Sequence, residues 1–138
     1  MKNSEQIFHL RTKFILGLII IIFIVAACRK ENNETFNEKL NGKWIWVKSI
    51  GGFGGQTYTP QSTGETIIIE FMNDSIYKEY YNGNLSLNTT FIIDSIDGVS
   101  LIKYKNKVPS SIIDHLDGIH LILRDYATDS YVSTYTRK

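Results

Sequence analysis

The chain of 138 residues contains one cysteine, two prolines and three histidines, and its charges nearly cancel. A single cysteine excludes a disulfide within the chain, so the fold has to be held by its core. With 15 basic and 14 acidic residues, the net charge of +1 provides no basic surface of the kind that nucleic acids require. The uncharged apolar run of residues 14–27 is also too short to span a bilayer, which takes roughly 20 residues.

The motifs of common enzyme classes are absent as well. No Gly-x-Ser-x-Gly elbow occurs, and the glycine-rich stretch 51–55 is not followed by the Lys-Ser/Thr of a phosphate-binding loop. Carboxylates such as Asp94, Asp97 and Asp117 stand at expected turns, where ordinary turn formation explains them. We therefore predict that the protein is not an enzyme and has neither a catalytic residue nor a cofactor.

Two of the three histidines come close together if Asp117-Gly118 forms a two-residue turn. His115 then pairs with His120 across a hairpin, with the cross-strand Cβ atoms about 5 Å apart. With Asp114 or Asp117 such a pair could bind zinc or copper, but two histidines on an exposed hairpin make a poor site. We interpret them as solvated turn residues and predict no metal site.

The N-terminus has the pattern of an export signal. Lys2, Arg11 and Lys13 precede the apolar run, and Val25-Ala26-Ala27-Cys28 closes it. A basic start, a short apolar core and a small-residue cleavage site predict a secretory signal peptide over residues 1–27.

The residues around the expected cleavage point resemble the lipobox of bacterial lipoproteins. The resemblance implies that signal peptidase II cuts before Cys28, whose thiol then carries diacylglycerol and whose new amino group is acylated, for example with palmitate. Two or more acyl chains anchor a protein stably, so we expect attachment to a membrane of the bacterial envelope through Cys28. Lys30-Glu31 loosely resembles signals that send lipoproteins across the outer membrane, which leaves both its surface and its periplasmic face open.

The remaining chain divides into a linker and one domain. Residues 28–39 are mostly polar, and we interpret them as the lipidated cysteine and a flexible tether. Residues 40–138 are enough for one domain with a real core.

From Gly42 onward the pattern is that of β-strands. Turn signals recur about every 8–12 residues, and three expected turns carry an Asn-Gly or Asp-Gly pair. Thr35 followed three residues later by Glu38 predicts a short helical turn before the first strand. Eight strands are expected, at residues 43–50, 65–72, 75–81, 85–94, 99–105, 111–116, 119–125 and 131–137. We predict an all-β fold, an eight-stranded antiparallel up-and-down barrel, with a β-sandwich as the alternative.

Two further motifs are similar to those of lipocalins. Gly42-Lys43-Trp44 resembles the Gly-x-Trp that opens their first strand, and Tyr135-Thr136-Arg137 resembles their closing strand. Together with the lipobox, these motifs resemble the small lipocalin-like lipoproteins of Gram-negative bacteria. The resemblance implies a lipocalin-like barrel in which Arg137 packs across Trp44 and closes one end.

The family also implies a ligand cavity, but an eight-stranded barrel is only just wide enough for its side chains to fill. Bulky residues expected to point inward are Trp46, Phe71, Phe91 and Leu121.

Aromatic residues suggest where a ligand could enter. The chain has eight tyrosines, more than a small core needs, and the loop 51–64 is expected to form a flap over the barrel mouth. Candidate residues at that mouth are Phe53, Tyr58, Tyr77 and Tyr81. We predict a binding module for a small apolar or amphipathic ligand. The alternative is a structural or protein-interaction lipoprotein with a filled barrel and a tyrosine-rich outer face.

Overall fold

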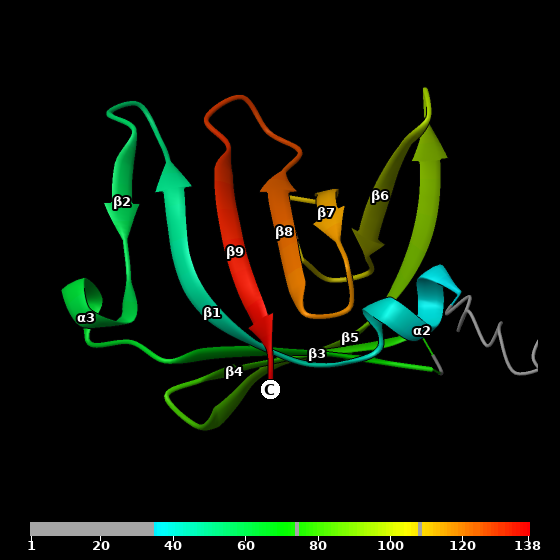
Figure 1. Ribbon diagram of the computed structural model, residues 1–138, viewed down its shortest axis with the longest axis horizontal. Coiled ribbons are helices and arrows are strands. Elements are labelled where there is room, and N and C mark those ends of the chain that lie inside the picture. The colour runs from blue at the N-terminus through cyan, green and yellow to red at the C-terminus, as the bar shows by residue number, and fades with distance from the viewer. Residues whose placement is uncertain (1–34, 74, 108) are drawn as a thin grey trace, which may run out of the picture. The chain divides into compact units, whose positions relative to one another are not determined.

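The computed structural model describes residues 35–73, 75–107 and 109–138 (Figure 1). The predicted signal peptide, Cys28 and most of the predicted tether lie outside the described residues. Within the described part, no helix has the length and apolar character needed to cross a membrane.

Among the described residues, two short helices accompany the strands, and both begin with a capping box. Helix α2 spans Phe36–Leu40, and the side chain of Thr35 accepts the backbone N–H of Glu38 while the Glu38 carboxylate accepts the backbone N–H of Thr35. The predicted helical turn is therefore confirmed, and its first residues overlap the end of the predicted tether. Helix α3 spans Pro60–Thr63, with Thr59 as its N-cap, Pro60 in its first turn and Gly64 at its C-cap.

Nine strands occur in the part of the chain that the structure describes. They are β1 Gly42–Gly51, β2 Gln56–Tyr58, β3 Ile67–Met72, β4 Ile76–Tyr81, β5 Asn84–Ile96, β6 Val99–Tyr104, β7 Ser111–Leu116, β8 His120–Asp125 and β9 Tyr131–Arg137. With β2 left aside, the other eight strands pair antiparallel in chain order, and β9 pairs back with β1 to close the ring. Strand β2 pairs antiparallel with β1 and is not part of the ring. The predicted eight-stranded up-and-down barrel is confirmed. The sandwich alternative is wrong, because one continuous ring of pairings joins all eight strands.

Strand β1 contacts different partners along its length. Its first residues, Gly42 to Ile45, pair with β3, whereas Ser49 to Gly51 pair with β2. Its other edge pairs with β9 from Trp44 to Gly51, with an irregularity between Trp46 and Lys48. Strand β2 and helix α3 therefore take the place beside β1 that a longer β3 would fill, as Figure 1 shows.

The two ends of the ring differ in what covers them. We call the end with α2, the β7–β8 connection and the chain's last residue the closed end. The other end, where the β1–β3, β6–β7 and β8–β9 connections lie, is the open end. The segment 52–66 at the open end contains β2 and α3, which the sequence had not predicted.

Large side chains fill the middle of the barrel. Phe71 lies at the centre, with ring centroids 5.2 Å from those of Tyr77 and Phe91. The core comprises Leu40, Trp44, Ile69, Phe71, Tyr77, Phe91, Ile102, Tyr104, Leu121 and Leu123. Trp46, Phe71, Phe91 and Leu121, which the alternation predicted to point inward, are all buried. The middle of the barrel is therefore occupied by these side chains.

The β7–β8 hairpin corrects one prediction. Its connection is longer than the expected two-residue turn, so Leu116 pairs with Leu121 and His115 pairs with Ile122 instead of His120. The reason is the Asp117 carboxylate, whose Oδ1 accepts the backbone N–H groups of Ile119 at 2.8 Å and of His120 at 2.6 Å. This side-chain capping fixes a wider turn.

The two imidazoles nevertheless meet at one carboxylate. Asp117 Oδ2 lies 3.2 Å from Nε2 of His115 and 3.1 Å from Nδ1 of His120. Within residues 35–138, apart from 74 and 108, no group of three or more His, Cys, Asp or Glu side chains is placed to hold a metal ion.

Asp117 makes the stability of this hairpin depend on pH. The backbone N–H groups of His120 and Ile119, and then the two imidazoles, hold the pKa of the Asp117 carboxyl well below its usual range. Its contribution to stability is therefore present above the unfolded value of about 3.9 and is lost as the pH falls through the lower folded pKa. We expect Asp117→Ala to lower Tm at pH 7 and this deficit to shrink below about pH 4. Thermal unfolding of both proteins between pH 7 and pH 2 tests this, and a deficit of constant size would contradict it.

Candidate functional site

The closed end is held by a stack of Arg137 on Trp44. The guanidinium carbon lies 4.6 Å from the centroid of the indole, which is itself fully buried. The guanidinium also donates hydrogen bonds to the carbonyl oxygens of Lys39, Asn41 and Gly118, that to Asn41 being 2.8 Å long. These bonds tie α2 and the β7–β8 connection to the last strand. The structure thus places the two predicted closure residues in direct contact.

Glycine is required at position 42 by this arrangement. A Cβ atom there would lie 2.8 Å from Nη1 of Arg137, and the backbone φ of +125° disfavours any L side chain. The Gly-x-Trp motif therefore supplies both the ring on which the guanidinium stacks and the space that it occupies.

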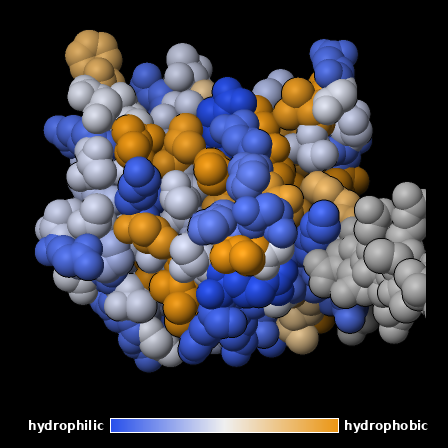
Figure 2. All heavy atoms as spheres, in the orientation of Figure 1, coloured by the Kyte–Doolittle hydropathy of each residue, from blue (hydrophilic) through white to orange (hydrophobic). Residues whose placement is uncertain are grey.

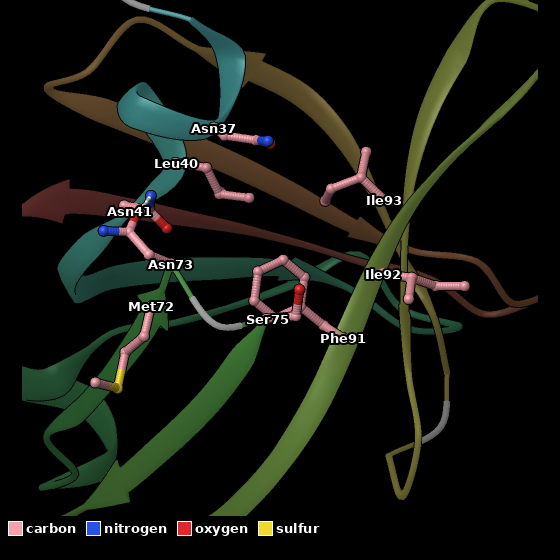
Figure 3. A pocket seen from close by; sticks show the side chains of 9 residues that line it. All are labelled: Asn37, Leu40, Asn41, Met72, Asn73, Ser75, Phe91, Ile92 and Ile93. Carbon is pink, nitrogen blue, oxygen red and sulfur yellow. Dashed lines mark hydrogen bonds between the residues drawn. The ribbon is translucent and has the colours of Figure 1, made fainter.

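A groove of about 430 Å³ lies beside α2, between this helix, the β3–β4 turn and β5 (Figure 3). Leu40 extends from α2 toward β5, and Ile93 extends from β5 toward α2. Its lining residues are Asn37, Leu40, Asn41, Met72, Asn73, Ser75, Phe91, Ile92 and Ile93, of which none is charged. Among these described residues, amide side chains lie at one side and aliphatic groups at the other.

A second hollow, which we call the mouth pocket, lies at the open end beneath β2 and α3. Its volume is about 440 Å³. It is lined by Trp46 and Ser49 of β1, Tyr58 of β2, Thr63 of α3, Glu65 and Ile67 at the start of β3, Asp125 of β8, and Tyr131 and Ser133 of β9. The pocket exists because β3 begins too late to pair with the second half of β1.

Hydrogen bonds fix the floor of the mouth pocket. Nε1 of Trp46 donates to Oγ of Ser49 at 2.8 Å, and this oxygen lies 2.7 Å from Oγ of Ser133. The bond to Ser49 holds the indole of Trp46 in one orientation, with only 4% of the residue exposed. Ser133 also forms a hydrogen bond with the Tyr135 hydroxyl, which opposes the rise that burial causes in the pKa of that hydroxyl.

Two carboxylates line the mouth pocket. Burial raises the pKa of Asp125, although the backbone N–H of Tyr131 and the charge of Lys107 oppose this effect. Glu65 forms a hydrogen bond with the Tyr81 hydroxyl, which raises the pKa of that tyrosine. Asp125 is thus a partly dehydrated acid at the entrance to the barrel.

A second polar group, which we call the inner cluster, comprises Lys107, Glu79, Tyr77 and Tyr104. Nζ of Lys107 lies 2.5 Å from Oε2 of Glu79 and donates to the Tyr77 hydroxyl at 2.9 Å. The same ammonium lies 4.9 Å and 5.3 Å from the ring centroids of Tyr77 and Tyr104. Burial raises the pKa of both tyrosines, which keeps them neutral.

The four residues predicted for a ligand mouth lie in different places. Tyr58 lines the mouth pocket and packs on Tyr131, with ring centroids 6.1 Å apart. Phe53 is fully exposed at the β1–β2 connection, Tyr77 belongs to the buried core, and Tyr81 is half-exposed at the end of β4. These three do not line the mouth pocket. Asp125, Tyr131 and Glu65, which do line it, were not singled out from the sequence.

Comparison with known proteins found no matching family model, no similar curated protein and no similar solved structure. The functional interpretation therefore depends on the sequence motifs and on the geometry of the two ends of the barrel.

Proposed function

We propose that this protein is a lipid-anchored envelope protein, related in design to lipocalins, that binds a small amphipathic molecule in its mouth pocket. The observation that carries this proposal is the pocket itself, which combines three aromatic rings with a few polar groups in a concave space of about 440 Å³. Small-molecule sites typically have this combination of apolar walls and a few polar groups, and they are common in the mouths of β-barrels.

Anchoring through Cys28 is the second part of the proposal. The lipobox supports it, as does the placement of the first described helix, α2, directly after the polar segment that follows Cys28. Globomycin, which inhibits signal peptidase II, should cause the precursor to accumulate. A Cys28→Ala chain that still carries lipid, or that is processed normally, would contradict the anchor.

The mouth pocket is favoured over the groove beside α2 as the ligand site because of the residues that surround each of them. The mouth pocket has a wall of Trp46, Tyr58 and Tyr131 and is covered by a segment that the barrel itself does not need. The groove beside α2 lies next to the Arg137 network, where movement would disturb the closure of the barrel.

One alternative remains supported by an observation. The middle of the barrel is filled by side chains, as expected for a structural or protein-interaction module. On the face that Figure 2 shows, however, hydrophobic residues lie in small groups between hydrophilic ones instead of forming one broad patch. A protein-docking surface on that face would ordinarily be larger and more continuous.

Native mass spectrometry of the full chain, purified gently from its own envelope, tests the proposal. We expect a reproducible additional mass that is lost on denaturation, beyond any covalent lipid at Cys28. Tyr58→Ala should weaken retention of this molecule about tenfold, equivalent to about 1.4 kcal/mol, because its ring forms part of the pocket wall. Phe53→Ala is the matched control, since this exposed ring lies outside the pocket lining. A bare chain that also takes up nothing from an envelope extract would contradict ligand binding.

A further inference from the structure

We infer that the mouth pocket selects a ligand with a positively charged group, an amine or quaternary ammonium, attached to a small apolar body. This inference rests on the proposed function, because it specifies the ligand class of the same pocket. It is carried by the placement of Asp125 and Glu65 among three aromatic side chains.

The charged groups in the pocket wall are all of one sign. Asp125 and Glu65 contribute carboxylates, and among the described lining residues there is no lysine, arginine or histidine. Within the described residues neither carboxylate has a cationic partner within 4.0 Å, in contrast to Glu79, which pairs with Lys107. A cation entering the pocket therefore meets two acids whose charge is not yet matched.

Of the two carboxylates, Asp125 is expected to interact more strongly with a cationic ligand. It ends β8 at the rim of the barrel, where it is partly removed from water. An ionised carboxylate loses hydration there, and an opposite charge nearby compensates for this loss more effectively than in water. Lys107 is close enough to lower the Asp125 pKa, but its ammonium is already bound to Glu79 and Tyr77.

The aromatic wall favours the same ligand. Trp46, Tyr58 and Tyr131 all line the pocket, and a cation within about 6 Å of a ring centroid is attracted to the ring face, most strongly for tryptophan. The bond from Trp46 to Ser49 holds the indole in place before a ligand arrives. An anionic ligand would meet the negative faces of these rings as well as the two carboxylates.

The groove beside α2 provides an internal comparison. It has nearly the same volume, about 430 Å³, and its described lining residues, which exclude position 74, carry no charge and include one aromatic ring, Phe91. Among the described residues, two acids beside three aromatic rings are therefore a feature of the mouth pocket.

Three probes of one shape test the inference: 2-phenylethylamine, 2-phenylethanol and phenylacetate at pH 7. Binding is followed by NMR of the full chain labelled with ¹⁵N, which contains two tryptophans. The indole N–H of Trp46 reports on the mouth pocket, and that of Trp44 reports on the closed end. We expect the amine to shift the Trp46 signal and to bind at least about tenfold more tightly than the alcohol, with the carboxylate weakest. The Trp44 signal should not move.

Substitutions of the two acids test whether they cause the preference for the amine. Asp125→Asn should bring the amine and the alcohol to within about threefold of each other, and Glu65→Gln should have a smaller effect of the same sign. Asp129→Asn is the matched control, since it removes one exposed acid from the neighbouring β8–β9 connection outside the pocket lining. Thermal unfolding establishes that each variant is folded.

The outcomes separate this inference from the proposed function. If the alcohol or the carboxylate binds as tightly as the amine, charge selection is wrong while ligand binding in the pocket stands. If Asp125→Asn binds the amine in preference to the alcohol by the same factor as the unaltered chain, the assignment of selectivity to Asp125 is wrong. If no probe shifts the Trp46 signal, the inference fails, and the native mass measurement decides separately whether a ligand is carried at all.

Discussion

Arg137→Ala is expected to destabilise the barrel by about 3 kcal/mol, lowering Tm by more than about 10 °C. The substitution removes the stack on Trp44 and three donated hydrogen bonds that join α2, the β7–β8 connection and β9. It also leaves carbonyl groups of α2 and one face of a buried indole without their partner. Thermal and urea unfolding of the two proteins measure the loss.

Controls separate the planar group from its charge. Arg137→Lys retains the charge but cannot stack or donate to three carbonyls at once, so it should recover less than half of the loss. Affinity at the mouth pocket should stay within about twofold, because the pocket lies at the opposite end of the barrel. A change in Tm of less than 3 °C for Arg137→Ala would contradict the assigned role.

Lys107→Met is expected to cost about 2 kcal/mol. The ammonium connects Glu79 to Tyr77 and lies against two rings, and its removal leaves the Glu79 carboxylate partly buried without a cation. The effect should lie between those of exposed and fully buried ion pairs, because the two side chains are 29% and 25% exposed.

A double-mutant cycle with Glu79→Gln tests this explanation. The double variant should be more stable than the sum of the single effects predicts, by at least about 1 kcal/mol, since the unpaired carboxylate is then absent. Lys103→Met is the matched control, because the exposed Lys103–Asp94 pair should contribute at most about 0.5 kcal/mol. Additive losses would show that Lys107 acts through packing of its aliphatic stem alone.

Most of the barrel could be predicted because local patterns determine it. Asn82-Gly83 and Asp97-Gly98 have positive φ at both positions and form the two-residue turns that such pairs favour. Asp117-Gly118 has the same composition but a different turn, because the Asp117 side chain caps two backbone N–H groups. Composition alone does not distinguish these two uses of an aspartate.

Helix α3 at the open end has a sequence pattern from which it could have been predicted. Thr59, Pro60 and Ser62 form the start of a capped helix and Gly64 ends it, all within the loop 51–64 that the sequence predicts as a flap. The inner cluster had no such signal. Lys107 lies in the connection between two predicted strands, and its approach to Glu79 depends on closure of the whole ring.

The same ring closure has a consequence for how the chain folds. The pairing of β1 with β9 joins residues some ninety positions apart, as in the contact of Trp44 with Arg137, so it forms only when the entire domain is available. Until then β1 and β8 both have unpaired edges, which can pair with other chains. Loss of the last seven residues should therefore favour aggregation of the chain over formation of a smaller barrel.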